Sequence, residues 1–361
     1  MMKSWRREAL GLLAVVSLGL MVVAFVSDHA SQGPEMMELK KTDSVCSDRY
    51  SKETLKRIAE LPFAAAFAET KGEKKWEASD VTIVDGSFYA VHDSSWAISK
   101  ISPHFLVNSN ENVQIGEPSS PPPALLSDKG SDSGFEGIVE IDAHNFYVVR
   151  ESVDVGEYRA VILKLQLPDI ILEECPSEMI FEGDSKGFEG AASVMGRDGT
   201  FYLLGLCEGN FCAEGDRGKD PGNGRIVVMV REDADNDFTC HWKTLAILNI
   251  PETAHFQDYS SLTVQENRVA ISSQEDSQLW TGHLNLDEDG FFDPTTAKLT
   301  KGTVFNFPRD ATCKIQYCNI EGIHWVNDEI LVAVSDKMKS KGKQHFRCLD
   351  KDQSIHLFVI P

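Results

Sequence analysis

The chain has 361 residues, a formal net charge of -21 and a sequence pI near 4.9. This acidity excludes nucleic acid and an anionic membrane surface as the main partner, and it makes cations and cationic groups the natural counterparts. The length allows one large domain or two small ones, and a repeat that extends over nearly all of the chain favours one closed architecture.

The N-terminal segment predicts export. Lys3, Arg6 and Arg7 precede an apolar run from Ala9 to Val26. This pattern is typical of a signal peptide or an uncleaved signal anchor, and the length of the run favours the anchor. In both cases the positive flank stays inside. We therefore expect residues 1–26 to be a transmembrane or signal helix and the rest to lie on the extracytoplasmic side, with a secreted or periplasmic protein as the alternative.

Residues 27–60 predict a tether and a short helix. The tether is polar, contains Gly33 and Pro34, and has no apolar period. The segment from Tyr50 to Thr70 is ambiguous. Its first half suggests a short helix that carries Leu55 and Ile58, whereas residues 61–67 have the composition of a strand. We therefore expect the folded domain to span residues 61–361.

A repeated motif divides this domain into units. The letters Gly-Phe-Glu-Gly occur at residues 134–137 and 187–190, and Ile-Glu-Gly-Ile occurs at residues 320–323. Weaker copies begin at Glu77 and Asp258. Each copy is followed by an apolar run that ends in an acid, and a third apolar run closes the unit. The copies are about 60 residues apart, close to the period of a four-stranded propeller blade with long loops.

We therefore predict an all-β protein, a β-propeller with five four-stranded blades, with six blades as the alternative. The fifth unit ends at Pro361 without a fourth strand. A strand from the N-terminal side would close the ring, and residues 61–67 are the expected donor.

Two sets of acidic residues are expected at one mouth of the central channel. In a propeller, the first strand of each blade runs along the channel and the second returns beside it, so the start of the first lies next to the end of the second. The first strands open with Glu77, Glu136, Glu189, Asp258 and Glu321. The second strands end with Asp93, Glu151, Glu208, Glu275 and Asp336.

Carboxylates gathered in this way repel one another unless a cation or protons neutralise them. Calcium accepts six to eight oxygen ligands in irregular geometry, so it suits the two sets better than magnesium. A structural role is the alternative. In that case each carboxylate accepts backbone N–H bonds from the next blade, and the glycine allows a tight turn.

Few residues beside these acids could take part in catalysis. His92 and His324 lie next to the two sets and are candidates for a general base, or for ordinary packing residues. Arg150 and Lys186 flank the motifs and would either bind a phosphate group or neutralise neighbouring acids. No nucleophile elbow is predicted, so serine-hydrolase chemistry is not expected.

The eight cysteines agree with an oxidising compartment. Cys207 with Cys212, and Cys313 with Cys318, are near enough in sequence to close small loops. Four further cysteines have no evident pairing, namely Cys46, Cys175, Cys240 and Cys348. A zinc site built from the two C-x4-C pairs is the competing interpretation, but zinc sites usually have shorter cysteine spacing.

The Phe-Glu-Gly-Ile and Ile-Glu-Gly-Ile motifs, each followed by an apolar run that ends in Glu or Asp, resemble the esterase-like phytase propeller family. The plan is also similar to that of five-bladed calcium-activated nucleotidases. The resemblance spans about residues 77–361 and implies a calcium-dependent propeller that acts on phosphate or related esters. By position, it implies Glu77, Glu136, Glu189 and Glu321 as ligands. Blade one has Glu-Ala and blade four has Asp-Tyr-Ser in place of Glu-Gly.

The sequence thus predicts an exported, calcium-dependent propeller hydrolase of phosphate or other ester substrates. In this hypothesis the acidic ring holds the ion, and the ion polarises the scissile group and activates water. The alternative is a non-catalytic propeller that binds a ligand or an unknown protein and uses its acidic motifs structurally. A fold alone does not distinguish the two, because function belongs to the site.

Overall fold

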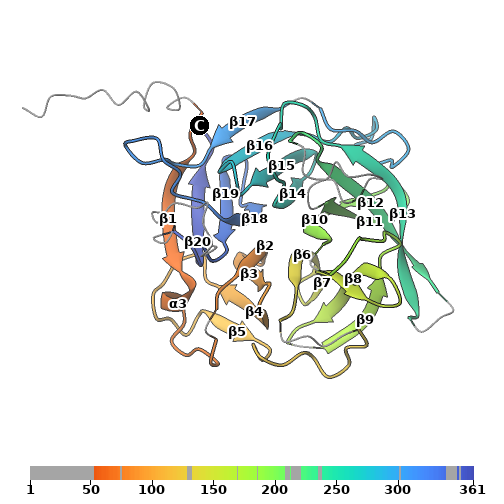
Figure 1. Ribbon diagram of the computed structural model, residues 1–361, viewed down its shortest axis with the longest axis horizontal. Helices are drawn as coiled ribbons and strands as arrows, with labels where there is room; N and C mark the ends of the chain where they lie inside the picture. The colour runs from red at the N-terminus through yellow and green to blue at the C-terminus, as the bar shows by residue number, and fades with distance from the viewer. Residues whose placement is uncertain are drawn as a thin grey trace, which may run out of the picture. The chain divides into compact units, whose positions relative to one another are not determined.

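The computed structural model describes residues 53–361, apart from residues 74, 128–131, 169, 185, 208–211, 213–220, 235–237, 301, 339–347 and 349–350. This part of the chain forms five antiparallel four-stranded sheets around one axis (Figure 1), which confirms the predicted five-bladed propeller. The predicted signal or anchor and the tether up to residue 52 lie outside the described residues. Within the described residues, no helix has the length and apolar character needed to cross a bilayer.

Each blade is a sheet whose innermost strand lies at the axis (Figure 1). Blade one contains β2 (Ala78–Val84), β3 (Ser87–His92), β4 (Ser95–Ile101) and β5 (Val113–Ile115). Blade two contains β6 (Phe135–Asp142), β7 (Asn145–Asp154), β8 (Tyr158–Gln166) and β9 (Ile170–Pro176). Blade three contains β10 (Phe188–Met195), β11 (Phe201–Cys207), β12 (Arg225–Asp233) and β13 (Cys240–Asn249).

The last two blades complete the ring. Blade four contains β14 (Ser261–Gln265), β15 (Arg268–Ser273), β16 (Gln278–His283) and β17 (Thr303–Asn306). Blade five contains β18 (Ile320–Trp325), β19 (Ile330–Ser335) and β20 (Ser354–Val359), with β1 (Lys56–Pro62) as its outer strand.

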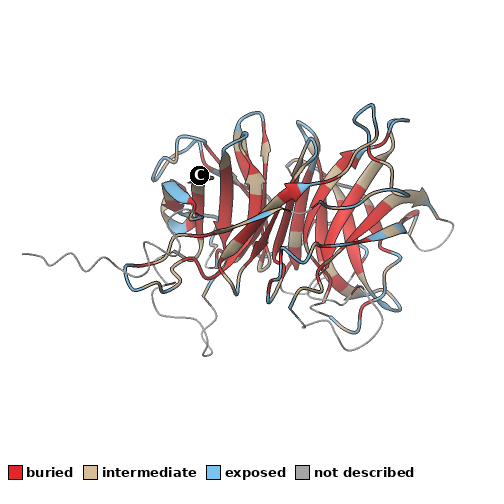
Figure 2. Ribbon diagram, turned by 90° about the horizontal axis from the view of Figure 1, so that it is seen from above, coloured by how far each residue is buried: buried red, intermediate tan, exposed pale blue. Residues whose placement is uncertain are grey.

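The apolar runs of the sequence become strands that are buried on both faces. In β11, Leu203 packs toward blade two and Leu204 toward blade four, because successive side chains point to opposite faces of a sheet. The same alternation yields five hydrophobic clusters, one between each pair of neighbouring blades. Figure 2 shows buried residues running through the middle of the blades and exposed residues in the loops at both faces. Continuous apolar runs are expected for strands covered on both sides.

The N-terminal strand closes the ring, as predicted, but the boundaries differ from the expectation. Strand β1 pairs with β20 through residues 56–62, and the expected donor segment contributes only Leu61 and Pro62 to it. The short helix, α3, spans Phe63–Ala66 and follows the strand. The expected order of helix and strand was therefore wrong, and residues 56–60 belong to the propeller. Pairing with the open edge of β20 decides this, because β1 buries Leu61 in the cluster between blades five and one.

A network of polar side chains fastens β1 to blade five. Glu60 pairs with His356 in the register, and one of its carboxylate oxygens lies 2.6 Å from Nζ of Lys351. The other oxygen lies 3.2 Å from Nδ1 of His356. Burial raises the pKa of Glu60, but the hydrogen bonds and charges of His356 and Lys351 outweigh burial and lower the pKa to about 2. The carboxylate is therefore ionised near neutral pH and stabilises the closure.

Three disulfides connect described cysteines. Cys207 is bonded to Cys212, as predicted. The predicted Cys313–Cys318 pair is wrong, because Cys318 is bonded to Cys348, at a Cα–Cα distance of 5.5 Å. Cys313 is also in a disulfide. These bonds contradict the zinc interpretation, because cysteines of both C-x4-C pairs are oxidised and offer no thiolates.

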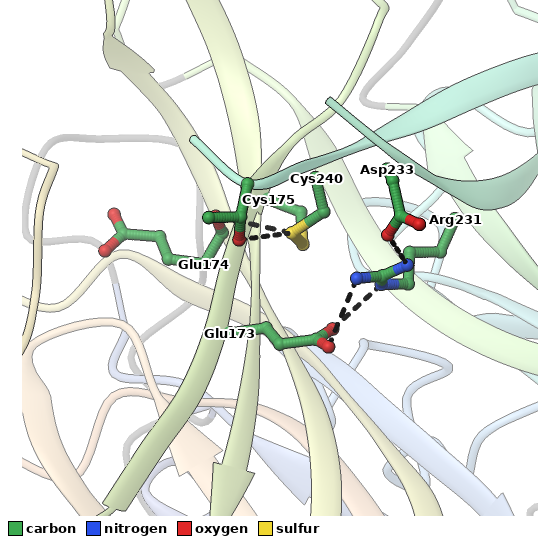
Figure 3. Close-up of a disulfide and its surroundings, with 7 residues drawn as sticks. Glu173, Glu174, Cys175, Arg231, Asp233 and Cys240 are labelled. Carbon is green, nitrogen blue, oxygen red and sulfur yellow. Dashed lines mark hydrogen bonds and ion pairs between the residues drawn. A yellow bond between two sulfur atoms is a disulfide. The ribbon is translucent and has the colours of Figure 1, made fainter. Parts of the chain in front are cut away.

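The third disulfide joins two blades. Cys175 at the end of β9 is bonded to Cys240 at the start of β13, with 5.1 Å between their Cα atoms. Figure 3 shows this bond beside Arg231, whose guanidinium bridges Glu173 of blade two and Asp233 of its own strand. The disulfide therefore joins the outer strands of blades two and three, and the Arg231–Glu173 ion pair joins β9 to β12.

The closure network leads to a prediction about Glu60. Replacing Glu60 by Gln removes the charge that faces Lys351 and His356, so we expect a loss of about 1–3 kcal/mol in the free energy of unfolding at pH 7. The folded-state pKa is lowered, so this contribution is present above the unfolded value of about 4.5 and is lost as the pH falls toward about 2. Chemical denaturation of both proteins as a function of pH measures the difference.

The matched control is Glu329→Gln, which changes an exposed acid of the same blade and should leave stability within about 0.5 kcal/mol. If Glu60→Gln is as stable as this control at pH 7, the carboxylate does not stabilise the closure.

Candidate metal centre

The Phe-Glu-Gly motif is a β-bulge at the start of an innermost strand. In blades two, three and five, the register shifts across the glutamate, so the residue before it and the glycine after it face consecutive residues of the second strand. The flanking pairs are Phe135↔Arg150 and Gly137↔Val149, Phe188↔Cys207 and Gly190↔Leu206, and Ile320↔Ser335 and Gly322↔Val334. The glutamate is the extra residue. A bulge bends its strand and redirects a side chain, and here it places Glu136 at the channel mouth.

The glycine is needed because innermost strands of neighbouring blades almost touch at the axis. A Cβ atom on Gly322 would lie 2.6 Å from Cα of Asp80, and one on Gly190 would lie 3.0 Å from N of Leu262. Real Cβ atoms do not approach backbone atoms as closely as 2.6 Å. The glycine that follows the glutamate in the motif therefore has a steric cause, the crowding at the axis, which is independent of any metal.

The register corrects the predicted acidic ring in two blades. In blade one the bulge falls on Ser79, since Ala78 pairs with His92 and Asp80 with Val91. In blade four Ser261 pairs with Ser272, so Ser260 takes the glutamate position. Glu77 and Asp258 each lie two residues before the ring position of their own blade, which is Ser79 in blade one and Ser260 in blade four. The ring at the mouth therefore has three glutamates, Glu136, Glu189 and Glu321, and these two serines.

The displaced acids have other partners. The carboxylate of Glu77 lies 3.9 Å from Nζ of Lys75 and 3.7 Å from Nζ of Lys337. Asp258 accepts hydrogen bonds from Ser273 Oγ and from the backbone N–H of Glu275. Burial raises the pKa of Asp258 to about 6, against the effect of these two hydrogen bonds.

Three carboxylates converge at the mouth on the side of blades one and two. Oxygen atoms of Asp93, Glu136 and Glu151 all lie within 4.8 Å of one another. Asp93 follows β3 and Glu151 lies in β7, so two members come from the predicted second set. The N–H of Gly134 donates to the carbonyl of Asp93 at 2.8 Å, and the carbonyl of Gly134 accepts from the N–H of Glu151 at 2.7 Å. This link fixes the two backbones next to each other.

Gly134 also makes room for the cluster. Its φ is +63°, and a Cβ atom there would lie 2.8 Å from Cγ of Glu151. A larger residue would both strain the backbone and displace the Glu151 side chain. The first glycine of Gly-Phe-Glu-Gly thus positions one of the three carboxylates.

The cluster is electrostatically strained. Burial raises the pKa of Glu136 well above its usual range, and the charges of Glu189, Asp93, Glu321 and Glu151 raise it further. Within the described residues, no Lys or Arg pairs with the Glu136 carboxylate. The site therefore favours protons or an added cation.

The remaining members of the second set differ in position. Asp336 is half-buried and occupies the place equivalent to Asp93 and Glu151, with its N–H donating to the carbonyl of Asn319 at 2.9 Å. Glu275 is exposed and does not occupy the equivalent place in blade four. Gln274, one residue earlier in the chain, occupies that place. Glu208 lies outside the described residues.

The two candidate histidines do not join the cluster. His92 is 1% exposed, packs against Phe63 and Trp76, and its Nε2 lies 2.8 Å from Oγ of Ser99. Burial lowers the pKa of His92 to about 3. His324 lies three residues beyond Glu321 in β18, about 10 Å deeper along the channel. Neither position brings an imidazole to the three carboxylates.

One of the two candidate cations, Arg150, has a structural role. Arg150 is 2% exposed, lies over the ring of Trp96 at 4.9 Å, and donates to the carbonyl of Ser133 and to Oγ of Ser127. It therefore connects blades one and two. Lys186 is half-buried, and its carbonyl accepts from the N–H of Ser152 at 3.0 Å.

A hydrogen-bonded hub beneath the carboxylates was missed by the sequence analysis. Asp80 is 1% exposed and occupies the place of the motif glycine, where its carboxylate accepts from the N–H groups of Val81 at 2.9 Å and Ile138 at 3.0 Å. Ser261 takes the same place in blade four and accepts from the N–H of Ile323 at 2.9 Å. Burial raises the pKa of Asp80, while these N–H bonds act in the opposite direction. The blades can be aligned in the sequence on their second strands instead of on their acidic residues. That alignment would have placed Asp80 and Ser261 at the positions of the motif glycines.

No protein-family model matches the chain, and no curated protein matches it. Solved propeller structures are similar at low identity. A glutaminyl cyclase from Myxococcus xanthus is 8% identical over 86% of this chain and 98% of its own, with a TM-score of 0.43. A PQQ-bound aldose sugar dehydrogenase from Streptomyces coelicolor is 12% identical over 84% of this chain and 98% of its own, with a TM-score of 0.40. These likenesses say nothing about the activity of this chain, and membership in the esterase-like phytase family stays an expectation.

The close approach at the axis predicts a large effect of Gly322→Ala. The added Cβ would meet the backbone of Asp80 and the side chain of Val334, so we expect the unfolding free energy to fall by about 3 kcal/mol. Gly183→Ala is the matched control, since nothing lies within 4 Å of a Cβ there. Denaturation curves of both variants measure the difference, and equal stability would contradict the steric role of the glycine.

The strained cluster predicts that Glu136→Gln stabilises the metal-free protein. The folded-state pKa of Glu136 is raised, so ionisation destabilises the fold: the penalty is absent below about pH 4.5 and grows as the pH rises through the folded-state value. We expect a thermal midpoint at least about 2 °C above wild type at pH 8 in chelator, and a smaller gap at pH 5. Glu182→Gln, at an exposed acid, should show no gap. A destabilised Glu136→Gln protein at pH 8 would contradict the repulsion.

Proposed function

We propose that the protein binds a divalent cation at the channel mouth, that this cation is calcium, and that the bound cation serves the hydrolysis of phosphate or other ester substrates. The observation that carries the proposal is the convergence of Asp93, Glu136 and Glu151 within 4.8 Å, in a cluster whose mutual repulsion raises the pKa of Glu136.

The chemistry of the donor set fits calcium. All three groups offer carboxylate oxygens, which hard cations prefer, and the set lacks the imidazole and thiolate groups that select zinc or copper. Glu189 and Glu321 are near enough to Glu136 to raise its pKa, so they supply further negative charge around the ion. Calcium accepts such an irregular set more readily than magnesium, which requires near-octahedral geometry.

For hydrolysis, a bound calcium ion would supply positive charge that polarises the phosphoryl or carbonyl group and activates water. The residues of the chain would then position the substrate at the mouth and accept a proton. Glu189 and Glu321 are candidates for the second task, because their charges act on Glu136 at the same mouth. The buried hub of Asp80 and Ser261 lies beneath them.

One observation favours the second candidate, a non-catalytic propeller that holds a cation and a ligand or protein. His92 and Arg150 are buried between blades, so neither is available to a substrate.

Both candidates fit an exported protein. Buried disulfides join parts of the propeller, and such bonds persist in oxidising compartments. We propose that the propeller lies on the extracytoplasmic side, anchored through residues 1–26 or released by their removal.

The first experiment measures the thermal midpoint of the full-length protein after chelation, with and without calcium, at pH 8. We expect calcium at about 100 times its dissociation constant to stabilise the wild type by about 2.7 kcal/mol and magnesium to stabilise it less. The Glu136→Gln/Glu189→Gln variant should lose most of this response. The matched Glu182→Gln/Glu329→Gln variant, which removes two exposed acids, should keep it. No calcium response in the wild type would refute the metal centre.

Hydrolysis is tested separately on para-nitrophenyl phosphate and para-nitrophenyl acetate. Calcium-dependent release of nitrophenol that the double variant loses would support the hydrolase. A normal calcium response without release from either compound would favour the binding propeller.

A further inference from the structure

A hollow lies at the axis, on the side of the Asp80 and Ser261 hub that faces away from the acidic mouth. It has a volume of about 190 Å³. Five equivalent residues, each two positions beyond the hub position of its own innermost strand, contribute to its wall: Thr82, Val139, Ala192, Thr263 and His324. Glu140 and Ser193 also line the hollow, and the exposure of Glu140 shows that it opens at the face opposite the acidic mouth. We call this hollow the lower channel.

The lower channel presents polar groups without hydrogen-bond partners. Thr82 is 2% exposed and Thr263 is 3% exposed, yet within the described part of the chain neither hydroxyl makes a hydrogen bond. Nδ1 of His324 lies 2.9 Å from the carbonyl oxygen of Trp325 and donates to it in the neutral tautomer. Burial lowers the pKa of His324, which keeps the ring neutral. Nε2 is then a hydrogen-bond acceptor, and it has no partner among the described residues.

The charge of the lower channel is negative. Glu140 lines it, and Asp85 and Asp142 are near enough to act electrostatically on Glu140. No Lys or Arg belongs to the described lining. The groups that a ligand would meet are therefore a carboxylate, a neutral imidazole nitrogen and hydroxyls. All of these accept hydrogen bonds, and the carboxylate attracts positive charge.

The size of the lower channel limits its ligand. A volume of about 190 Å³ is small beside the ~300–1,000 Å³ of sites for drug-sized ligands, so the lower channel suits a small molecule. A metal ion is a poor candidate, because His324 and Glu140 do not form part of a three-ligand cluster among the described residues.

We propose that the lower channel is a second binding site, specific for a small protonated amine. The ammonium group donates to Nε2 of His324 and to the threonine hydroxyls, and Glu140 balances its charge. The hub separates this site from the carboxylate cluster at the mouth, so the inference does not depend on the proposed hydrolase.

The probe is ethanolamine, and ethylene glycol is its neutral counterpart of the same size. The full-length protein, labelled with 15N in its histidine rings, is titrated with each compound at pH 8 in the presence of calcium. We expect ethanolamine to shift the His324 Nε2 resonance with a dissociation constant on the order of millimolar, and ethylene glycol to leave it unchanged. The resonance is identified by its loss in His324→Gln.

Three variants locate the binding. Glu140→Gln should weaken ethanolamine at least about tenfold, because it removes the only charge in the described lining while preserving its shape. Glu266→Gln, which changes an exposed acid in the β14–β15 turn, should bind normally. Glu136→Gln, at the opposite mouth, should also bind normally.

The outcomes decide the proposal. A charge-dependent shift that only Glu140→Gln weakens supports an amine site. The proposal is overturned by the absence of a shift up to about 100 mM, an equal shift with ethylene glycol, or a loss of binding in Glu136→Gln. The last result would place the amine at the mouth.

Discussion

The close approach of five strands at one axis is the constraint on which the rest of the propeller depends. Each innermost strand has an open edge, and the backbones of neighbouring strands lie so near that a Cβ atom does not fit at Gly322 and would be crowded at Gly190. The N–H groups on these edges lose access to water and need acceptors. Asp80 and Ser261 provide them at the level where the other blades have glycine. Sterics and hydrogen bonding therefore select the residues at the axis together.

The same constraint concentrates negative charge. The bulge before each glycine turns Glu136, Glu189 and Glu321 toward one mouth, and the second strands bring Asp93 and Glu151 beside them. The pKa of Glu136 is raised because burial and its neighbours disfavour a further charge. A fold that maintains such repulsion between carboxylates is suited to binding a cation.

Successive side chains of a strand point in opposite directions, and this explains why the acidic residues and the candidate catalytic residues lie in different places. Asp93 and Glu151 reach the mouth, whereas His92 and Arg150, one residue earlier, point between the blades and pack on aromatic rings. His92 and Arg150 therefore lie on the side of the sheet away from the carboxylates that follow them in sequence. The chemistry proposed for the mouth therefore relies on carboxylates and on the proposed cation.

The sequence by itself determined the five-bladed architecture, the runs that become strands, and the gathering of acids at one mouth, because hydrophobic period and motif spacing are local properties. Only the tertiary structure decided the rest. The register showed Ser79 and Ser260 in the ring in place of Glu77 and Asp258, because pairing between strands, and not the sequence of acids, sets which residue faces the axis. The order of β1 and α3, the Cys318–Cys348 bond and the burial of His92 likewise depend on contacts between distant segments.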